Sequence, residues 1–254
     1  MMTGQSGVRI LPSPFLNGSI DLGRATGFII QQNRSYSCYS IALTFNVKTG
    51  ETRAIIFGAQ ETSVLDLFAY MNTLSPLPYG PMFIPTVALE LQARWFTETI
   101  KSCQDHIHKI ETTTGMRQLE KSQDGTPDET QSWKNLDLIS TTRDLSSLLS
   151  RFSFLKLQAE TGAYLTKQME LSAASLLAEL CSAQNHDLID SQTDTISKII
   201  DLQDWYLGIM NRCKYLSERT AAQTQTVCVL AALERRKEGL GSKGLGFRSY
   251  FLSG

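Results

Sequence analysis

Residues 145–180 decide the fold, and they read LSSLLSRFSFLKLQAETGAYLTKQMELSAASLLAEL. Apolar and small residues recur along this stretch in alternating steps of three and four. That spacing places them on one face of a helix, as in the seam of a coiled coil. The seam positions are Leu145, Leu148, Phe152, Leu155, Ala159, Gly162, Thr166, Met169, Ala173, Leu176 and Leu180. We therefore predict a long amphipathic helix over residues 143–180.

The same pattern returns over residues 195–238. Its seam positions are Leu202, Tyr206, Ile209, Cys213, Leu216, Thr220, Gln223, Val227 and Leu230. No proline interrupts either stretch, and Gly162 and Gly208 are the only glycines inside them. Two such helices in succession predict a long antiparallel helical hairpin over residues 133–238.

The seam can be filled in two ways. It can be a private core, in which the two helices pack on each other and on the rest of the chain. Against this, Thr220 and Gln223 are polar seam residues, and two helices alone bury little surface. We therefore favour a homo-oligomer or a partner helix.

The residues before the hairpin predict strands. Residues 27–30 read as a short strand. Residues 39–45 alternate in the period of a half-buried strand, and residues 52–57 supply its partner across a turn at residues 48–50, which makes a β-hairpin.

Two helices should follow this β-hairpin. Ser63 is a candidate N-cap of a short one, and a longer one should begin near Thr86, with Pro85 before it, and stop before Gly115. Their apolar stripes are Val64, Leu65, Phe68 and Met71, and then Val87, Leu91, Trp95, Thr99, Cys103, Ile107 and Ile110. The predicted class is α+β, mostly α. The predicted parts are a flexible N-terminus (1–24), a small α/β head (25–115), a linker (116–132), the helical hairpin (133–238) and a glycine-rich tail (239–254).

Net charge, cysteine spacing and the lengths of apolar runs exclude several classes of function. A net charge of -1 gives no global field toward nucleic acid, so we expect no nucleic-acid partner. The five cysteines are scattered and never paired as CxxC, which favours reduced thiols and a cytoplasmic protein. Residues 1–14 lack a signal-peptide pattern, and the longest apolar run, residues 227–233, is too short to span a membrane.

Two short motifs resemble binding sites, but neither has the neighbouring structure that such a site requires. Residues 239–244 (GLGSKG) match GxGxxG, but a predicted helix precedes them, whereas the dinucleotide fingerprint follows a strand. Cys103 and His106 would share a helix face while His108 points away, so only two zinc ligands converge where a structural site needs four. Three histidines in all and no hydrolase motif argue against an enzyme.

One acidic stretch offers a weak metal site. Five aspartates lie between Asp187 and Asp204 against a single lysine, Lys198. Asp201 and Asp204 share a helix face, and Asp194 would approach from the turn before, so these three are the candidate ligands for weak Mg²⁺ binding. The alternative is a solvated loop, because residues 191–194 (SQTD) resemble a capping box at the start of the second helix.

Several motifs, in this order, carry a family resemblance. They are residues 36–41 (YSCYSI), 49–56 (TGETRAII), 81–85 (PMFIP), 110–115 (IETTTG), 211–216 (NRCKYL) and 222–227 (AQTQTV). The layout resembles the cytoplasmic portion of the CorA-like divalent-metal transporters, in the form common in filamentous fungi. The resemblance implies a sheet-containing head and a long stalk helix. It also implies a pentamer that senses Mg²⁺ between neighbouring subunits.

The chain departs from that family after the stalk. The family's stalk continues into two transmembrane helices, with a Gly-Met-Asn signature closing the first, and neither follows here, so no pore residue carries over. We expect a non-enzymatic, soluble CorA-like protein without a resident cofactor. It would be a regulatory or interaction module that conducts no ions alone and associates with a full-length membrane homologue. The alternative is a helical scaffold or accessory protein of a specialised pathway, such as a secondary-metabolite pathway, with no metal role.

Overall fold

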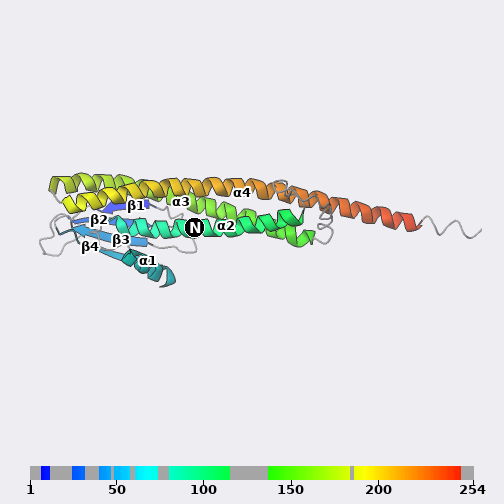
Figure 1. Cartoon of the computed structure of the whole chain (residues 1–254), viewed down its shortest axis with the longest axis horizontal. Coiled ribbons are helices and arrows are strands. Elements are labelled where there is room, and N and C mark those ends of the chain that lie inside the picture. Colours follow the sequence, from blue (N-terminus) through cyan, green and yellow to red (C-terminus); the bar gives the residue numbers. More distant parts are fainter. Residues whose placement is uncertain are drawn as a thin grey trace, which may run out of the picture. The chain divides into compact units, whose positions relative to one another are not determined.

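The computed structural model describes residues 7–11, 25–31, 40–46, 49–57, 61–73, 80–114, 137–183 and 186–246, and the structural statements below concern these residues. They form strands β1 (Gly7–Leu11), β2 (Ala25–Gln31), β3 (Ser40–Asn46) and β4 (Thr52–Phe57), and helices α1 (Glu61–Thr73), α2 (Phe83–Thr113), α3 (Leu138–Ala183) and α4 (His186–Gly246) (Figure 1). The predicted α+β, mostly α class is confirmed, with a β-hairpin in the head and a long antiparallel helical hairpin.

The chain divides into two compact units. Unit 1 comprises Met1–Glu98 and Leu155–Asn211, and unit 2 comprises Thr99–Phe154 and Arg212–Gly254. This division differs from the predicted one, which separated a head from a hairpin. The physical reason is that α2, α3 and α4 are each long enough to contribute residues to both units.

Unit 1 contains a four-stranded antiparallel sheet in the order β1-β2-β3-β4. The predicted strand at 27–30 and the predicted hairpin are confirmed as β2, β3 and β4. Alternate residues of β3 (Ile41, Leu43 and Phe45) are buried. Phe45 joins Leu176, Leu180 and Leu188 in one apolar cluster, so this face of the sheet packs on α3 and α4.

Two details of the sheet concern its first strand and its last turn. β1 lies within residues 1–24, which were predicted to lack regular structure, and it pairs with β2 from Gly7↔Gln31 to Leu11↔Gly27. The turn between β3 and β4 ends at Gly50, whose φ of 71° suits glycine and whose amide donates to the Asn46 carbonyl at 2.8 Å. The predicted turn is therefore confirmed.

Helix α1 packs on the start of α2 through Leu67, which lies in one apolar cluster with Phe83 and Val87. The predicted helix exists, but it begins at Glu61 rather than after Ser63, and the predicted stripe is wrong at two of its four positions. Leu65 and Phe68 are exposed, whereas Leu67 is buried. The face that packs is set by the position of α2, which the local pattern does not encode.

The seam of α3 and α4 is confirmed. All eleven predicted positions of α3 are buried, and on α4 all are buried except Leu230, which is half-buried. In unit 1, α2 adds a third helix beside this seam, because the Phe96 ring lies 6.3 Å from the Tyr206 ring. The predicted stripe of α2 is wrong at Trp95, which is exposed, while Phe96 is buried.

The helix ends differ from their predicted positions. Helix α3 begins at Leu138 rather than at residue 143, because Asp137 Oδ1 accepts hydrogen bonds from the amides of Ile139 and Ser140 and caps the helix. Helix α2 begins at Phe83 rather than near Thr86, with Pro85 in its first turn, where a missing amide proton costs little.

The start and end of α4 also lie outside their predicted bounds. The helix begins at His186, so residues 191–194 lie inside it and are no capping box. Gln192 is fully buried there and donates from Nε2 to the Ala173 carbonyl at 3.2 Å. The helix continues to Gly246, so part of the predicted tail is helical. The predicted linker, 116–132, lies outside the described residues.

Candidate functional site

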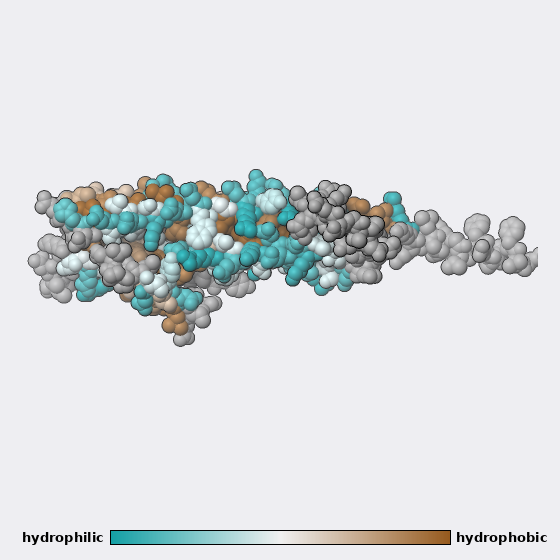
Figure 2. Space-filling view, viewed as in Figure 1, coloured by the Kyte–Doolittle hydropathy of each residue, from teal (hydrophilic) through white to brown (hydrophobic). Residues whose placement is uncertain are grey.

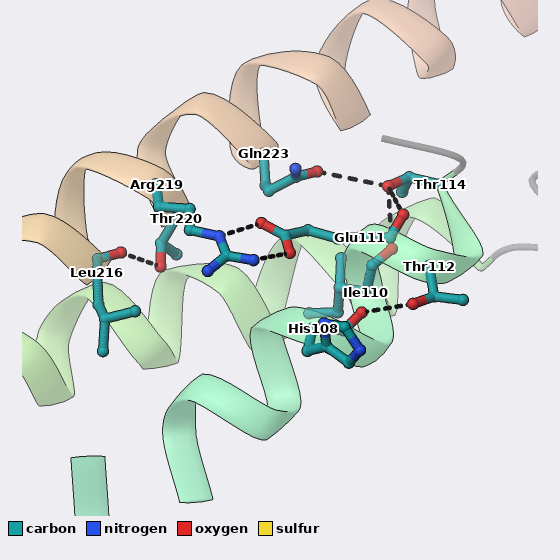
Figure 3. Close-up of polar contacts among 9 residues, drawn as sticks. All are labelled: His108, Ile110, Glu111, Thr112, Thr114, Leu216, Arg219, Thr220 and Gln223. Atoms are coloured by element: carbon teal, nitrogen blue, oxygen red, sulfur yellow. Dashed lines mark hydrogen bonds and ion pairs between the residues drawn. The ribbon is translucent and has the colours of Figure 1, made fainter. Parts of the chain in front are cut away.

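A cluster of polar side chains joins the end of α2 to α4 in unit 2 (Figure 3). Arg219 of α4 donates from Nε to Glu111 Oε1 at 2.5 Å, and its Nη2 donates to Glu111 Oε2. The Glu111 side chain is only 6% exposed and that of Arg219 is 29% exposed. The pair is therefore a bidentate and largely desolvated ion pair.

The positive charge of Arg219 and the negative charge of Glu111 stabilise each other. The hydrogen bonds to Glu111 raise the pKa of Arg219 above its ordinary value, so the guanidinium stays charged at every accessible pH. Both carboxylate oxygens of Glu111 accept a hydrogen bond from Arg219. A carboxylate bound in this way is poorly placed to act as a general base or as a metal ligand, so the pair acts as a clamp between two helices.

Two threonine side chains lie beside the clamp, one directly after the end of α2 and one on α4. The Thr114 hydroxyl lies 2.9 Å from the Ile110 carbonyl and 3.4 Å from Gln223 Oε1 of α4. Thr220, fully buried on α4, donates to the Leu216 carbonyl at 2.7 Å. The two polar seam residues that favoured a partner helix, Thr220 and Gln223, therefore have hydrogen-bond partners within unit 2.

In unit 1, the corresponding link between α2 and α4 is Tyr206. Its side chain is fully buried, and Oη lies 2.8 Å from the Leu89 carbonyl oxygen and 3.1 Å from Gln92 Oε1. Trp205 Nε1 donates to Thr97 Oγ1 at 3.1 Å. These contacts fix the rotation of α4 about its axis relative to α2 within this unit.

The three candidate metal ligands, Asp194, Asp201 and Asp204, are all exposed on α4. They do not approach from a turn, because Asp194 already lies inside the helix. Nowhere in the described part of the chain do three or more histidine, cysteine, aspartate or glutamate side chains gather so that they could hold a metal ion. Weak binding of hydrated Mg²⁺ by one or two of these carboxylates stays a prediction.

The structure also places the Cys103/His106 motif and the glycine motif at residues 239–244. Cys103 is buried while His106 is exposed, with Nε2 3.8 Å from Asp144 Oδ2, so the two side chains lie in different surroundings. Burial raises the pKa of the Cys103 thiol, which keeps it protonated. Residues 239–244 lie inside α4, so the glycine motif has no strand before it.

The Glu111–Arg219 clamp was not predicted from the sequence. Its two residues are separated by 108 positions, and each looks like an ordinary helix-surface charge. One signal was present, because Glu111 directly follows the apolar stripe of α2 and Arg219 directly precedes the polar seam residue Thr220. A charge beside a polar seam position is a candidate for a buried pair.

A search of the described residues for membrane-spanning helices and three comparisons with known proteins each found no match. A bilayer-spanning helix needs about 20 mostly apolar residues, and the helices of the described residues offer no such stretch. No family model, curated protein or solved structure matches this chain. The resemblance to CorA-like proteins therefore rests on the motifs quoted for it.

Proposed function

We propose that this chain is a non-enzymatic regulatory or interaction module, similar in design to the cytoplasmic portion of a CorA-like Mg²⁺ transporter, and that alone it conducts no ions. One observation carries the proposal. Two of the motifs behind the resemblance, residues 110–115 and residues 222–227, meet in unit 2 through Thr114 and Gln223. The Glu111–Arg219 clamp reinforces this contact from inside the first motif.

The non-enzymatic part of the proposal is supported by how the buried polar groups are used. Glu111 is engaged by Arg219, and the Tyr206 hydroxyl by the Leu89 carbonyl. Both side chains are used to hold α2 and α4 together, which is a structural role. The proposed location is cytoplasmic, from the cysteine pattern, and a net charge of -1 favours a protein partner over nucleic acid.

The proposed partners are another copy of the chain, a partner helix, or a full-length membrane homologue. A module of this kind would act by changing how such a partner assembles. We propose that Mg²⁺ biases that assembly through weak, water-mediated contacts with exposed carboxylates of α4, among them Asp201 and Asp204.

A helical scaffold without a metal role is the second candidate function. It is favoured by the exposure of Asp194, Asp201 and Asp204 and by the lack of a gathered ligand set among the described residues. The two candidates differ in one property, which is whether Mg²⁺ stabilises the fold beyond the effect of ionic strength.

The proposal that the chain conducts nothing is tested by reconstitution. Pure protein mixed with liposomes that contain a Mg²⁺-sensitive dye should give no more Mg²⁺ influx than protein-free liposomes. Influx that rises with protein concentration, and that a channel-blocking cation such as cobalt hexammine suppresses, would contradict the proposal.

A further inference from the structure

Helix α3 carries a second apolar stripe, on the side away from its buried seam. Leu157, Tyr164 and Leu171 are spaced by seven residues, so they lie in line along one face of the helix. They are 49%, 52% and 56% exposed, although their seam neighbours Leu155 and Met169 are buried. All three belong to unit 1.

The seven-residue spacing indicates what kind of surface could pack on this stripe. Single exposed apolar residues are ordinary, but three large ones at heptad spacing form a line that a second helix can follow. Brown, hydrophobic residues break the hydrophilic surface of α3 and α4 in Figure 2. The line therefore suits a helix that runs along α3.

The charges beside the stripe show which helix fits. Lys156, Glu160, Lys167 and Glu170 follow one another along the same side of α3, so their signs alternate from positive to negative. Read in the reverse direction, the signs are opposite at every position. In an antiparallel pair the same flank of each helix faces the other, so this row meets its own reverse with complementary charges, whereas in a parallel pair it would face the opposite flank of the second helix.

We propose that two copies of this chain pair through α3, antiparallel and with the two-fold axis at Tyr164. In this arrangement Leu157 packs against Leu171 of the second copy. Glu160 lies beside Lys167 of the second copy, and the same contact recurs across the axis. Such a contact is isologous, since both copies use the same surface.

The existing contacts of these charges permit the change. Lys156 Nζ lies 3.7 Å from Glu160 Oε1, and Lys167 Nζ lies 2.8 Å from Glu170 Oε2, with the lysines and Glu160 about half exposed. Exposed ion pairs of this kind exchange partners at little cost. A contact built on one helix face is small, so we expect a dimer with a dissociation constant in the range of about 10 to 100 µM.

The charge pattern gives a sharp test by sedimentation velocity, from about 5 to 500 µM protein, a range that brackets this dissociation constant. Wild type should form a dimer. Glu160→Lys and Lys167→Glu should each be monomeric, because each sets like charges across the axis. An equimolar mixture of these two variants should dimerise, and so should the double variant. Lys198→Glu, an equal charge change at an exposed site of α4 in the same unit, should dimerise as wild type does.

Two results would overturn the proposal. One is a wild-type protein that stays monomeric at the highest concentration, which would leave the stripe to a different protein. The other is a dimer that both single variants retain, which would place the contact on another surface. The inference does not depend on the proposed metal response, since the experiment is run in EDTA, and circular dichroism confirms that each variant is folded.

Discussion

The Tyr206 ring of α4 occupies the space where a side chain on Gly162 of α3 would begin. A Cβ placed on Gly162 would overlap the ring, and the ring cannot easily retreat, because it is fully buried and its hydroxyl is bound at the Leu89 carbonyl. Gly162 is therefore a seam residue that has to be small. The other glycine inside the two helices, Gly208, would place its Cβ with nothing within 4 Å.

These two glycines predict opposite effects for the same substitution. Alanine is favoured over glycine in a helix by about 1 kcal/mol, so Gly208→Ala should raise the free energy of unfolding by up to that amount. Gly162→Ala should lower it by about 1 to 3 kcal/mol, because overpacking outweighs the helix propensity. Urea unfolding measures both. Stabilisation by Gly162→Ala would show that α3 and α4 do not approach closely here.

The seam predicts a second contrast, between neighbours on α3. Leu155 is buried and Lys156 is exposed. Leu155→Asp should cost about 3 to 5 kcal/mol, because it removes apolar contacts and buries an unpaired charge. Lys156→Asp should stay within about 0.5 kcal/mol of wild type. Thermal melting compares the two, and equal shifts would mean that the seam runs along another face.

The Glu111–Arg219 clamp predicts a non-additive pair of mutations. Arg219→Met alone should cost about 3 to 5 kcal/mol, because it leaves the buried Glu111 carboxylate without its partner. The double variant Glu111→Leu/Arg219→Met should recover most of that loss, because no unpaired charge remains. A double-mutant cycle in urea measures the coupling. Additive costs would indicate that the two side chains do not interact.

The cysteines should differ in reactivity. Burial raises the pKa of the Cys103 thiol, so at a given pH it holds less thiolate than an exposed cysteine, and its side chain is also shielded. Cys181 and Cys228 are exposed. Iodoacetamide at pH 8 should modify these two first, as mass spectrometry of peptides would reveal, and should reach Cys103 only in urea. The folded thiol keeps its proton to a higher pH than the unfolded thiol, so the protein loses stability as the pH rises from the ordinary thiol pKa through the raised pKa of Cys103. Early modification of Cys103 in native protein would contradict its burial.

The sequence predicts the seam well, and the reason is geometric. Alternating steps of three and four put Leu145, Phe152 and Met169 on one helix face whatever the neighbours are. The β-hairpin was equally readable, because alternation and a glycine turn coincide at residues 39–57.

Features that depend on residues far away in the sequence were not predicted. β1 has five residues and is defined by its pairing with β2. The buried face of α1 depends on where α2 lies, so Leu67 is buried in place of Leu65. The start of α4 at His186 was missed because residues 191–194 imitate a helix cap. The clamp joins residues that no local pattern connects.

The two proposed functions differ in whether the fold responds to Mg²⁺, and a thermal melt in MgCl₂ against NaCl of equal ionic strength tests this most directly. For a dissociation constant near ~1 mM, a tenfold excess of Mg²⁺ should add about 1.4 kcal/mol to the free energy of unfolding. Asp201→Asn/Asp204→Asn should remove this gain. Asp66→Asn/Asp105→Asn, which deletes the same charge at exposed sites of α1 and α2, should keep it. If both salts raise the melting temperature alike in wild type, the aspartates of α4 are only a solvated helix face and the metal role is wrong.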